Sequence, residues 1–368
     1  YMKKKLIIGL LSSVIASQSF ACTDVNVSAK DGSVIAGRTM EWALDMGWQV
    51  QYMPKNTNIK IIQTSKSKSK DNIQIKTKYS FAGISTADYF NSFTDGQNEK
   101  GLSVSANFLP GYTQYESYNY SQPNKNISVI QAVEFILGSY SSVEDVKTNF
   151  SQYSVWYEDI PNLPISPSLH LLVTDKTGKS IVIEWIDGNM KIFDRSIGVM
   201  TNSPNYDWHL TNTKNYLNLN NKGSYTIAKT VNDKSISVSS LGQGSGGIGL
   251  PGDFTSPSRF IKVAYLQNYA KQPDNSQQAV QQVAHILNNV DIVNGTVVEN
   301  GEHVYDEITQ WITIKDLTNN KIYIADYDHR TNYVQIDLNK LFESKKPMSI
   351  KVNDIKYPTG LIDNPFQK

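Results

Sequence analysis

The segment SFACTDVNVSAKDGSVIAGRTMEW, residues 19–42, says more about the fold than any other part of the sequence. After Cys22, apolar and polar residues alternate through residues 24–28, and residues 33–38 form a second short run rich in apolar and β-branched residues. Alternation with period two predicts strands, and the Asp31-Gly32 pair between the two runs predicts a tight turn. The segment therefore predicts a β-hairpin.

The residues before this hairpin have the pattern of a signal peptide. Three lysines (residues 3–5) precede the apolar run 6–16, and small residues stand one and three positions before Cys22. The apolar run is too short to remain as a transmembrane anchor. We predict that residues 1–21 are removed, that residues 22–368 form a single domain without a stable membrane anchor, and that the protein is exported, either periplasmic or secreted.

Cys22 is the only cysteine in the chain, so it cannot form an internal disulfide. Cleavage before Cys22 would place an α-amino group on the residue that carries the thiol. Such an amine titrates at about 7.7 to 8.0 and a thiol at about 8.5, so the amine can accept the thiol proton near neutral pH. Cys22 is therefore a candidate N-terminal nucleophile.

A cysteine at this position also fits a lipid anchor or a core residue. A bacterial lipoprotein has a cysteine directly after its signal peptide, and a lipidated Cys22 would make the protein an anchored, catalytically inactive binding protein. Lipoprotein signals usually carry Leu three positions before the cysteine, where this chain has Ser19. A cysteine that only fills space in the core leaves its position at the cleavage site unexplained. The segment itself favours catalysis.

The rest of the chain alternates between strands and two pairs of helices. A formal charge of +1 gives no attraction to nucleic acid or to an anionic membrane. Helical spacing of apolar residues predicts helices at 128–140, 143–153, 257–270 and 276–290. Strands are predicted at 59–63, 79–84, 101–109, 169–174, 180–186, 191–194, 198–202, 307–315, 321–326 and 333–337. Helices that cover antiparallel sheets make an α+β layered domain.

Polar residues near strand ends are the other candidates for chemistry. Alternation places Arg38 on the face of Ala36 and Met40, where its guanidinium could hold the thiol or a substrate oxygen with Glu41 as its partner, although a surface arginine has the same pattern. Asn202 ends a strand and could donate to an oxyanion, or it could only shape the turn before Pro204. The five histidines are scattered, and His170 in an apolar run is typical of a core histidine. We expect no metal and no cofactor.

Cys22-Thr23 and the motif GRTMEW at 37–42 resemble the choloylglycine hydrolase family, which includes bile salt hydrolases and penicillin V acylases. Further motifs appear in the family's order over nearly the whole mature chain. They are NEKGL at 98–102, LH at 169–170, TDKTG at 174–178, MTNSP at 200–204, LPGD at 250–253 and SPSRF at 256–260.

The resemblance implies an αββα N-terminal nucleophile hydrolase fold, in which two antiparallel sheets stack between helix layers. It implies that Cys22 is the nucleophile, Arg38 the arginine near the thiol, Asn202 the oxyanion-hole asparagine and Arg259 a second arginine of the site. Glu41 stands where many members carry Asp, which contacts the N-terminal amine.

One further family position, Asn in bile salt hydrolases and often Tyr in penicillin V acylases, falls on Asn107 or on Phe108, and we assign it to Asn107. The resemblance also implies hydrolysis of a linear amide with an apolar acyl group, such as penicillin V, a conjugated bile acid or an acyl-homoserine lactone. It suggests a homotetramer, and the export signal with Glu41 resembles members from Gram-negative bacteria.

Overall fold

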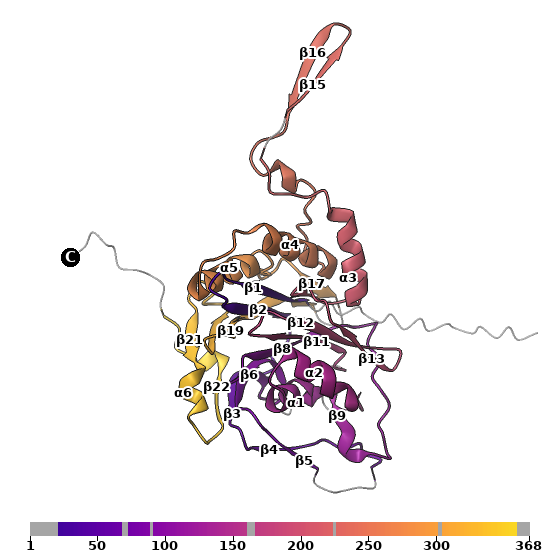
Figure 1. Cartoon of the computed structure of the whole chain (residues 1–368), viewed down its shortest axis with the longest axis vertical. Helices are drawn as coiled ribbons and strands as arrows, with labels where there is room; N and C mark the ends of the chain where they lie inside the picture. Colours follow the sequence, from indigo (N-terminus) through magenta and orange to yellow (C-terminus); the bar gives the residue numbers. More distant parts are fainter. Residues whose placement is uncertain are drawn as a thin grey trace, which may run out of the picture.

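The computed structural model describes residues 21–67, 73–88, 91–159, 166–223, 226–300 and 304–358. The predicted signal peptide therefore lies outside the described residues except for Ala21. Two antiparallel sheets stack face to face, with helices on the outer side of each (Figure 1). The predicted α+β class and αββα layering are confirmed.

The first sheet holds the hairpin that contains Cys22. Its six strands run in the order β14-β1-β2-β19-β20-β21. Strands β1 and β2 pair from Ala21 opposite Glu41 to Ser28 opposite Val34, so the predicted hairpin is confirmed. Gly32 in the turn has φ +86°, a conformation that glycine adopts without strain. The strands are β1 (Ala21–Ser28), β2 (Val34–Trp42), β14 (Val199–Met200), β19 (Ile308–Asp316), β20 (Lys321–Asp326) and β21 (Val334–Asp337).

The second sheet has eight strands in the order β13-β12-β11-β8-β7-β6-β3-β22. They are β3 (Trp48–Met53), β6 (Phe81–Thr86), β7 (Phe93–Asn98), β8 (Leu102–Phe108), β11 (Leu169–Asp175), β12 (Ser180–Ile186), β13 (Asn189–Phe193) and β22 (Met348–Lys351). Along β8, Leu102, Val104 and Ala106 face an apolar core. Ser105 and Asn107 alternate with them and face the first sheet, where they bond to its side chains.

Each predicted helix pair covers one sheet. Helices α4 (Ser256–Tyr269) and α5 (Ser276–Asn288) lie on the first sheet, and α1 (Ala132–Ser139) and α2 (Val143–Asn149) lie on the second (Figure 1). The predicted helices at 128–140 and 143–153 are α-helical only in part, because 3-10 turns occupy Val129–Gln131 and Phe150–Gln152.

Gly37 lets α5 approach the first sheet closely. A Cβ atom at this position would collide with the side chains of Val283 and Leu287 on α5. The glycine of the GRTMEW motif is therefore required for helix-to-sheet packing, and that packing fixes β2, the strand that carries Arg38.

The remaining elements are short. They are α3 (Tyr206–Asn212), α6 (Leu338–Phe342) and the paired strands β4 (Asn58–Lys60) with β5 (Gln74–Lys76), β9 (Asn126–Ser128) with β10 (Ser154–Trp156), β15 (Thr226–Val231) with β16 (Lys234–Ser239), and β17 (Val298–Asn300) with β18 (Val304–Asp306). The β15–β16 hairpin stands away from the layered body (Figure 1). In the described ranges no helix has both the length and the apolar character needed to cross a bilayer.

Candidate active site

Cys22 lies at the start of β1, and its side chain points into the space between the two sheets. It pairs with Met40 on β2, and its Sγ lies 3.8 Å from the Met40 Sδ. The residue is only 1% exposed. Because Ala21 precedes it, the nitrogen of Cys22 is a peptide nitrogen in this form of the chain.

Arg38 reaches from β2 across the space between the sheets. Its Nη2 donates to the Ala106 carbonyl at 2.7 Å and lies 3.7 Å from the Cys22 Sγ, while its Nη1 donates to the Thr94 carbonyl. The guanidinium also lies 5.3 Å from the centre of the Trp311 ring. These contacts hold a fully buried positive charge beside the thiol.

Asn202 follows β14 and contacts the backbone nitrogen of Cys22. Its Oδ1 accepts hydrogen bonds from the Cys22 nitrogen at 2.7 Å and from Arg259 Nη2 at 2.8 Å. Its Nδ2 donates to the Phe108 carbonyl at 2.9 Å. A carboxamide nitrogen carries two hydrogens, so this contact uses only one of them.

Arg259 on α4 fixes the backbone of Cys22, the candidate nucleophile. Its Nη1 donates to the Cys22 carbonyl at 2.7 Å and to the Thr23 hydroxyl at 2.6 Å, and its Nε donates to the Phe254 carbonyl at 2.9 Å. Together with its bond to Asn202, these contacts place Arg259 behind the candidate nucleophile.

The Cys22 thiol is hard to ionise in this form of the chain. Burial raises its pKa to about 11; Glu41 also raises it, whereas Arg38 and Arg259 act to lower it. At neutral pH the thiol is therefore protonated. A base must take its proton before it can attack a carbonyl.

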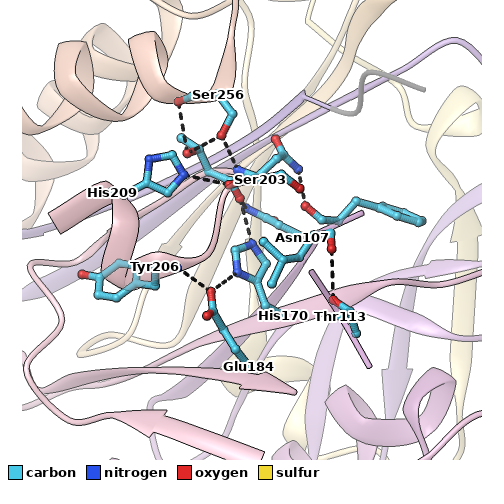
Figure 2. A network of polar contacts seen from close by, with 12 residues as sticks. Asn107, Thr113, His170, Glu184, Ser203, Tyr206, His209 and Ser256 are labelled. Atoms are coloured by element: carbon cyan, nitrogen blue, oxygen red, sulfur yellow. Dashed lines mark hydrogen bonds and ion pairs between the residues drawn. The ribbon is translucent and has the colours of Figure 1, made fainter. Parts of the chain in front are cut away.

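A network of buried and half-buried side chains holds the segment that carries Asn202 (Figure 2). Ser256 on α4 accepts from the Asn202 backbone nitrogen at 2.9 Å, and His209 Nε2 on α3 lies 2.8 Å from the Asn202 carbonyl. The preceding carbonyl, that of Thr201, lies 2.9 Å from His170 Nε2. Three secondary-structure elements thus fix the Asn202 backbone.

His170 connects this network to the second sheet. Its Nδ1 lies 3.0 Å from the Glu184 carboxylate, which also accepts from the Tyr206 backbone nitrogen at 2.8 Å (Figure 2). His170 is thus a buried histidine with both ring nitrogens bonded, and the prediction of a core histidine is confirmed. Thr201 O has no proton to give, so Nε2 is the donor in that contact.

Comparison with known proteins agrees with this arrangement. The model of the linear amide C-N hydrolases, choloylglycine hydrolase family, matches residues 22–350. The chain belongs to the choloylglycine hydrolase family. A bile salt hydrolase/transferase from Clostridium perfringens is 34% identical over 324 residues, which cover 87% of this chain and 93% of that protein.

Solved structures of family proteins have the same fold. A variant of the conjugated bile acid hydrolase from Clostridium perfringens superposes with a TM-score of 0.76 at 31% identity, over 90% of this chain and 97% of that one. Penicillin V acylase from Agrobacterium tumefaciens superposes with a TM-score of 0.69 at 22% identity, over 90% and 91% of the two chains. The second likeness shows the fold alone.

The expected pairing of Arg38 with Glu41 is wrong. The two residues are three positions apart on β2, so they point to opposite faces of the strand. Glu41 accepts from the Thr309 hydroxyl at 2.9 Å, and its Oε2 has no hydrogen-bond partner in the described part of the chain. Burial raises its pKa to about 8. Glu41 lies directly opposite Ala21 in the β1–β2 pair, next to the Ala21–Cys22 peptide bond.

Asn107, the residue assigned to the family's Asn or Tyr position, lies in the site. Its Nδ2 donates to Asp24 Oδ2 at 2.7 Å and to the Thr201 carbonyl at 3.1 Å. Phe108, the alternative, contributes its carbonyl to Asn202 and its ring to Trp42, with 5.4 Å between the ring centres. Asn107 thus connects β1 to the Asn202 segment, and both hydrogens of its amide are used.

The structure brings all six predicted site residues to one place: Cys22, Arg38, Glu41, Asn107, Asn202 and Arg259. It adds residues that the sequence argument missed, namely Asp24, His209, Ser256 and Glu184. Only Ser256 had a signal in the sequence, as part of the SPSRF motif. In the described residues no group of three or more His, Cys, Asp or Glu side chains could hold a metal ion.

Proposed function

We propose that this protein is an exported cysteine amidase that hydrolyses a linear amide bond and releases an apolar acyl group as its acid. One observation carries the proposal. In a member of a linear amide hydrolase family, the nitrogen of the only cysteine donates to Asn202 and its sulfur lies beside the Arg38 guanidinium. Removal of residues 1–21 would turn that nitrogen into an α-amine beside the thiol.

Acylation begins with proton transfer from the Cys22 thiol to its own α-amine. The thiolate attacks the amide carbon, and the carbonyl oxygen becomes an oxyanion. The free hydrogen on Asn202 Nδ2 is the donor available to that oxyanion. The tetrahedral intermediate collapses to a thioester as the C–N bond breaks, and the α-ammonium gives its proton to the departing amine.

Deacylation repeats these steps with water as the nucleophile. The α-amine takes a proton from water, hydroxide adds to the thioester carbonyl, and collapse of the second intermediate returns the thiolate and releases the acid. The proton then returns to the sulfur, so the cycle is balanced and uses no cofactor. Arg38 favours the thiolate in both half-reactions because it is a positively charged side chain 3.7 Å from the sulfur.

Glu41 is suited to hold the new amine. Its unpartnered Oε2 lies on the strand position opposite Ala21, and loss of Ala21 opens that position. A carboxylate there would orient the α-ammonium and would itself be stabilised by the new positive charge. The longer side chain of Glu41 would thus do what Asp does in other members.

The acyl group has an apolar wall beside the thiol. Residues that pack with Cys22 include Met40, Trp42, Phe108 and Trp311. An apolar wall discriminates weakly between related acyl groups. We therefore propose that phenoxyacetyl from penicillin V, a conjugated bile acid and a long acyl-homoserine lactone are all accepted at measurable rates.

The test is the initial rate of amine release from penicillin V, glycocholate and a long-chain acyl-homoserine lactone by protein that begins at Cys22. We expect turnover of all three substrates, at different rates, and none by Cys22→Ala. Full activity in Cys22→Ala would refute the mechanism. The intact mass of the protein processed in cells distinguishes the amidase from a lipid-anchored, inactive binding protein, because diacylation of Cys22 would add several hundred daltons and block the amine.

Export and assembly complete the proposal. The signal-peptide pattern supports a periplasmic or secreted protein, which cell fractionation with N-terminal sequencing would test. We also propose a homotetramer. The β15–β16 hairpin carries the exposed apolar side chains Ile227, Ile236 and Val238, which a subunit contact would cover. Light scattering of the purified protein, with and without charged residues at these three positions, tests it.

A further inference from the structure

Four charged side chains occupy the space between the two sheets near the thiol. Asp24 on β1, Arg38 on β2, Asp95 on β7 and Lys315 on β19 are each at most 1% exposed. Buried charges are costly unless they are neutralised. Which carboxylate pairs with which cation among these four therefore determines the electrostatic potential at the Cys22 sulfur.

Lys315 and Asp95 form a closed pair. Lys315 Nζ donates to Asp95 Oδ1 and, at 3.1 Å, to the Ser105 hydroxyl. Ser105 in turn donates to Asp95 Oδ1 at 2.8 Å, and Thr313 donates to Asp95 Oδ2 at 2.7 Å. Burial would raise the pKa of Asp95, but Lys315 first and Arg38 second hold it below its usual value. Asp95 is thus a carboxylate whose two oxygens are both occupied.

Arg38, by contrast, has no carboxylate partner. In the described residues its hydrogen bonds go to two carbonyls and to the Cys22 sulfur, and it forms no ion pair with a carboxylate. Yet it donates to the carbonyl of Thr94, the residue directly before Asp95. Asp24 stands opposite Arg38 in the β1–β2 pair, but it accepts from Asn107, and burial raises its pKa.

We propose that Lys315 is a positioning residue for the amidase reaction: it holds the negative charge of Asp95, so that the positive charge of Arg38 remains for the Cys22 thiolate. Without Lys315, Asp95 becomes the counter-ion of Arg38, and the thiolate loses the cationic side chain that lies beside it. The proposal rests on the proposed function of Cys22 as nucleophile. It extends that function to a residue that touches neither the thiol nor the substrate.

Other charges face the site and must be kept constant in any test. On the helix side of the first sheet are Glu41, Arg259 and Glu307, and Glu41 and Arg259 act directly on the thiol. Behind Asn107, the second sheet contributes His170 and Glu184. Asp95 and Lys315 bond instead to each other, to Ser105 and to Thr313, so substitutions in the pair leave the contacts of these charges in place.

The experiment measures the rate of Cys22 alkylation by iodoacetamide as a function of pH, in protein that begins at Cys22. Lys315→Met should raise the apparent thiol pKa by about one unit, which is about a tenfold slower alkylation at pH below the pKa. Asp95→Asn should lower it, because the lysine charge then adds to that of Arg38. The double variant should return near the wild-type value. Lys340→Met, which removes an exposed lysine, is the matched control.

A purely structural role gives a different result. Loosening of the site would impair all three variants without shifts of opposite sign, and an unchanged pKa in Lys315→Met would overturn the proposal. If Lys315→Met alone does not fold, the comparison of Asp95→Asn with the double variant still tests the charge of Lys315, and an unchanged pKa between them overturns the proposal equally. Alkylation needs no substrate, so its outcome is separate from the search for the amide that is hydrolysed.

Discussion

Retention of a single alanine before Cys22 should abolish catalysis. Two forms of the protein make the comparison: one begins at Cys22 and the other at Ala21. Each can be produced with an initiator methionine that is removed before a small residue. In the first form the Cys22 nitrogen is an amine; in the second it is an amide, and the α-amine lies one residue away on Ala21. An amide cannot accept a proton near neutral pH.

The size of the effect follows from the buried thiol. With a pKa of about 11, about one thiol in three thousand is ionised at pH 7.5 when no base is adjacent. In the form that begins at Cys22, an amine with an ordinary pKa near 8 is about a quarter neutral at the same pH and can take the thiol proton. We therefore expect kcat/KM to fall on the order of a thousandfold, within the range for loss of a general base.

The assay is the initial rate of amine release by both forms, with alkylation by iodoacetamide measured in parallel. Both rates should fall together in the Ala21 form. Thermal unfolding of both forms, measured in parallel, controls for the loss of the buried Ala21 and its pairing with Glu41. A rate in the Ala21 form within tenfold of the other would refute the argument that the Cys22 amine is the base.

Three further predictions concern residues around the thiol. Asn202→Ala should lower kcat by about 100- to 1,000-fold with little change in KM, as measured by steady-state kinetics, since it removes an oxyanion donor. Burial lowers the pKa of His209 to about 4, so its folded form binds a proton less readily than the unfolded chain. The free energy of unfolding should thus rise by roughly 3 kcal/mol from pH 4 to pH 6.5, and urea titrations of His209→Gln should show a smaller rise. Glu41 has the opposite effect on the pH dependence of stability in the Ala21 form. Burial raises its pKa to about 8, so folded Glu41 retains a proton that the unfolded chain loses above pH 4.5. Stability should therefore fall as pH rises toward 8, and Glu41→Gln should remove that loss; a parallel pH profile in the variant would contradict it.

The sequence predicted most strands of the two sheets but missed two central ones, β3, although its Trp48 and Val50 face an apolar core, and β7. Predicted and observed bounds agree for β12 and β20, at 180–186 and 321–326. Strand β7, with the sequence FTDGQN, was missed because Asp, Gly, Gln and Asn are typical of turns. In the structure, Asp95 and Gln97 of that strand bond to residues of the first sheet. Only the stacking of the sheets makes such a sequence a central strand.

The candidate site also contains residues that a local sequence pattern predicts and contacts that only the stacking of the two sheets creates. Cys22 was predictable from the cleavage pattern, and the face of Arg38 from alternation along one strand. The same alternation should have excluded the Arg38–Glu41 pair, because a spacing of three reverses the face. By contrast, the contact of Lys315 with Asp95 joins residues 220 positions apart. It depends on how two sheets stack, which a local pattern does not contain.

The surroundings of Asn202 have a consequence for kinetics. A rotated amide would place its nitrogen against two donors, the Cys22 nitrogen and Arg259, and its oxygen against the Phe108 carbonyl. Only one orientation satisfies all three contacts, so the free hydrogen on Nδ2 is held in a fixed direction before substrate binds. A donor fixed in this way needs no reorganisation when the oxyanion forms. Loss of the bonds that orient it should therefore lower kcat much more than it raises KM.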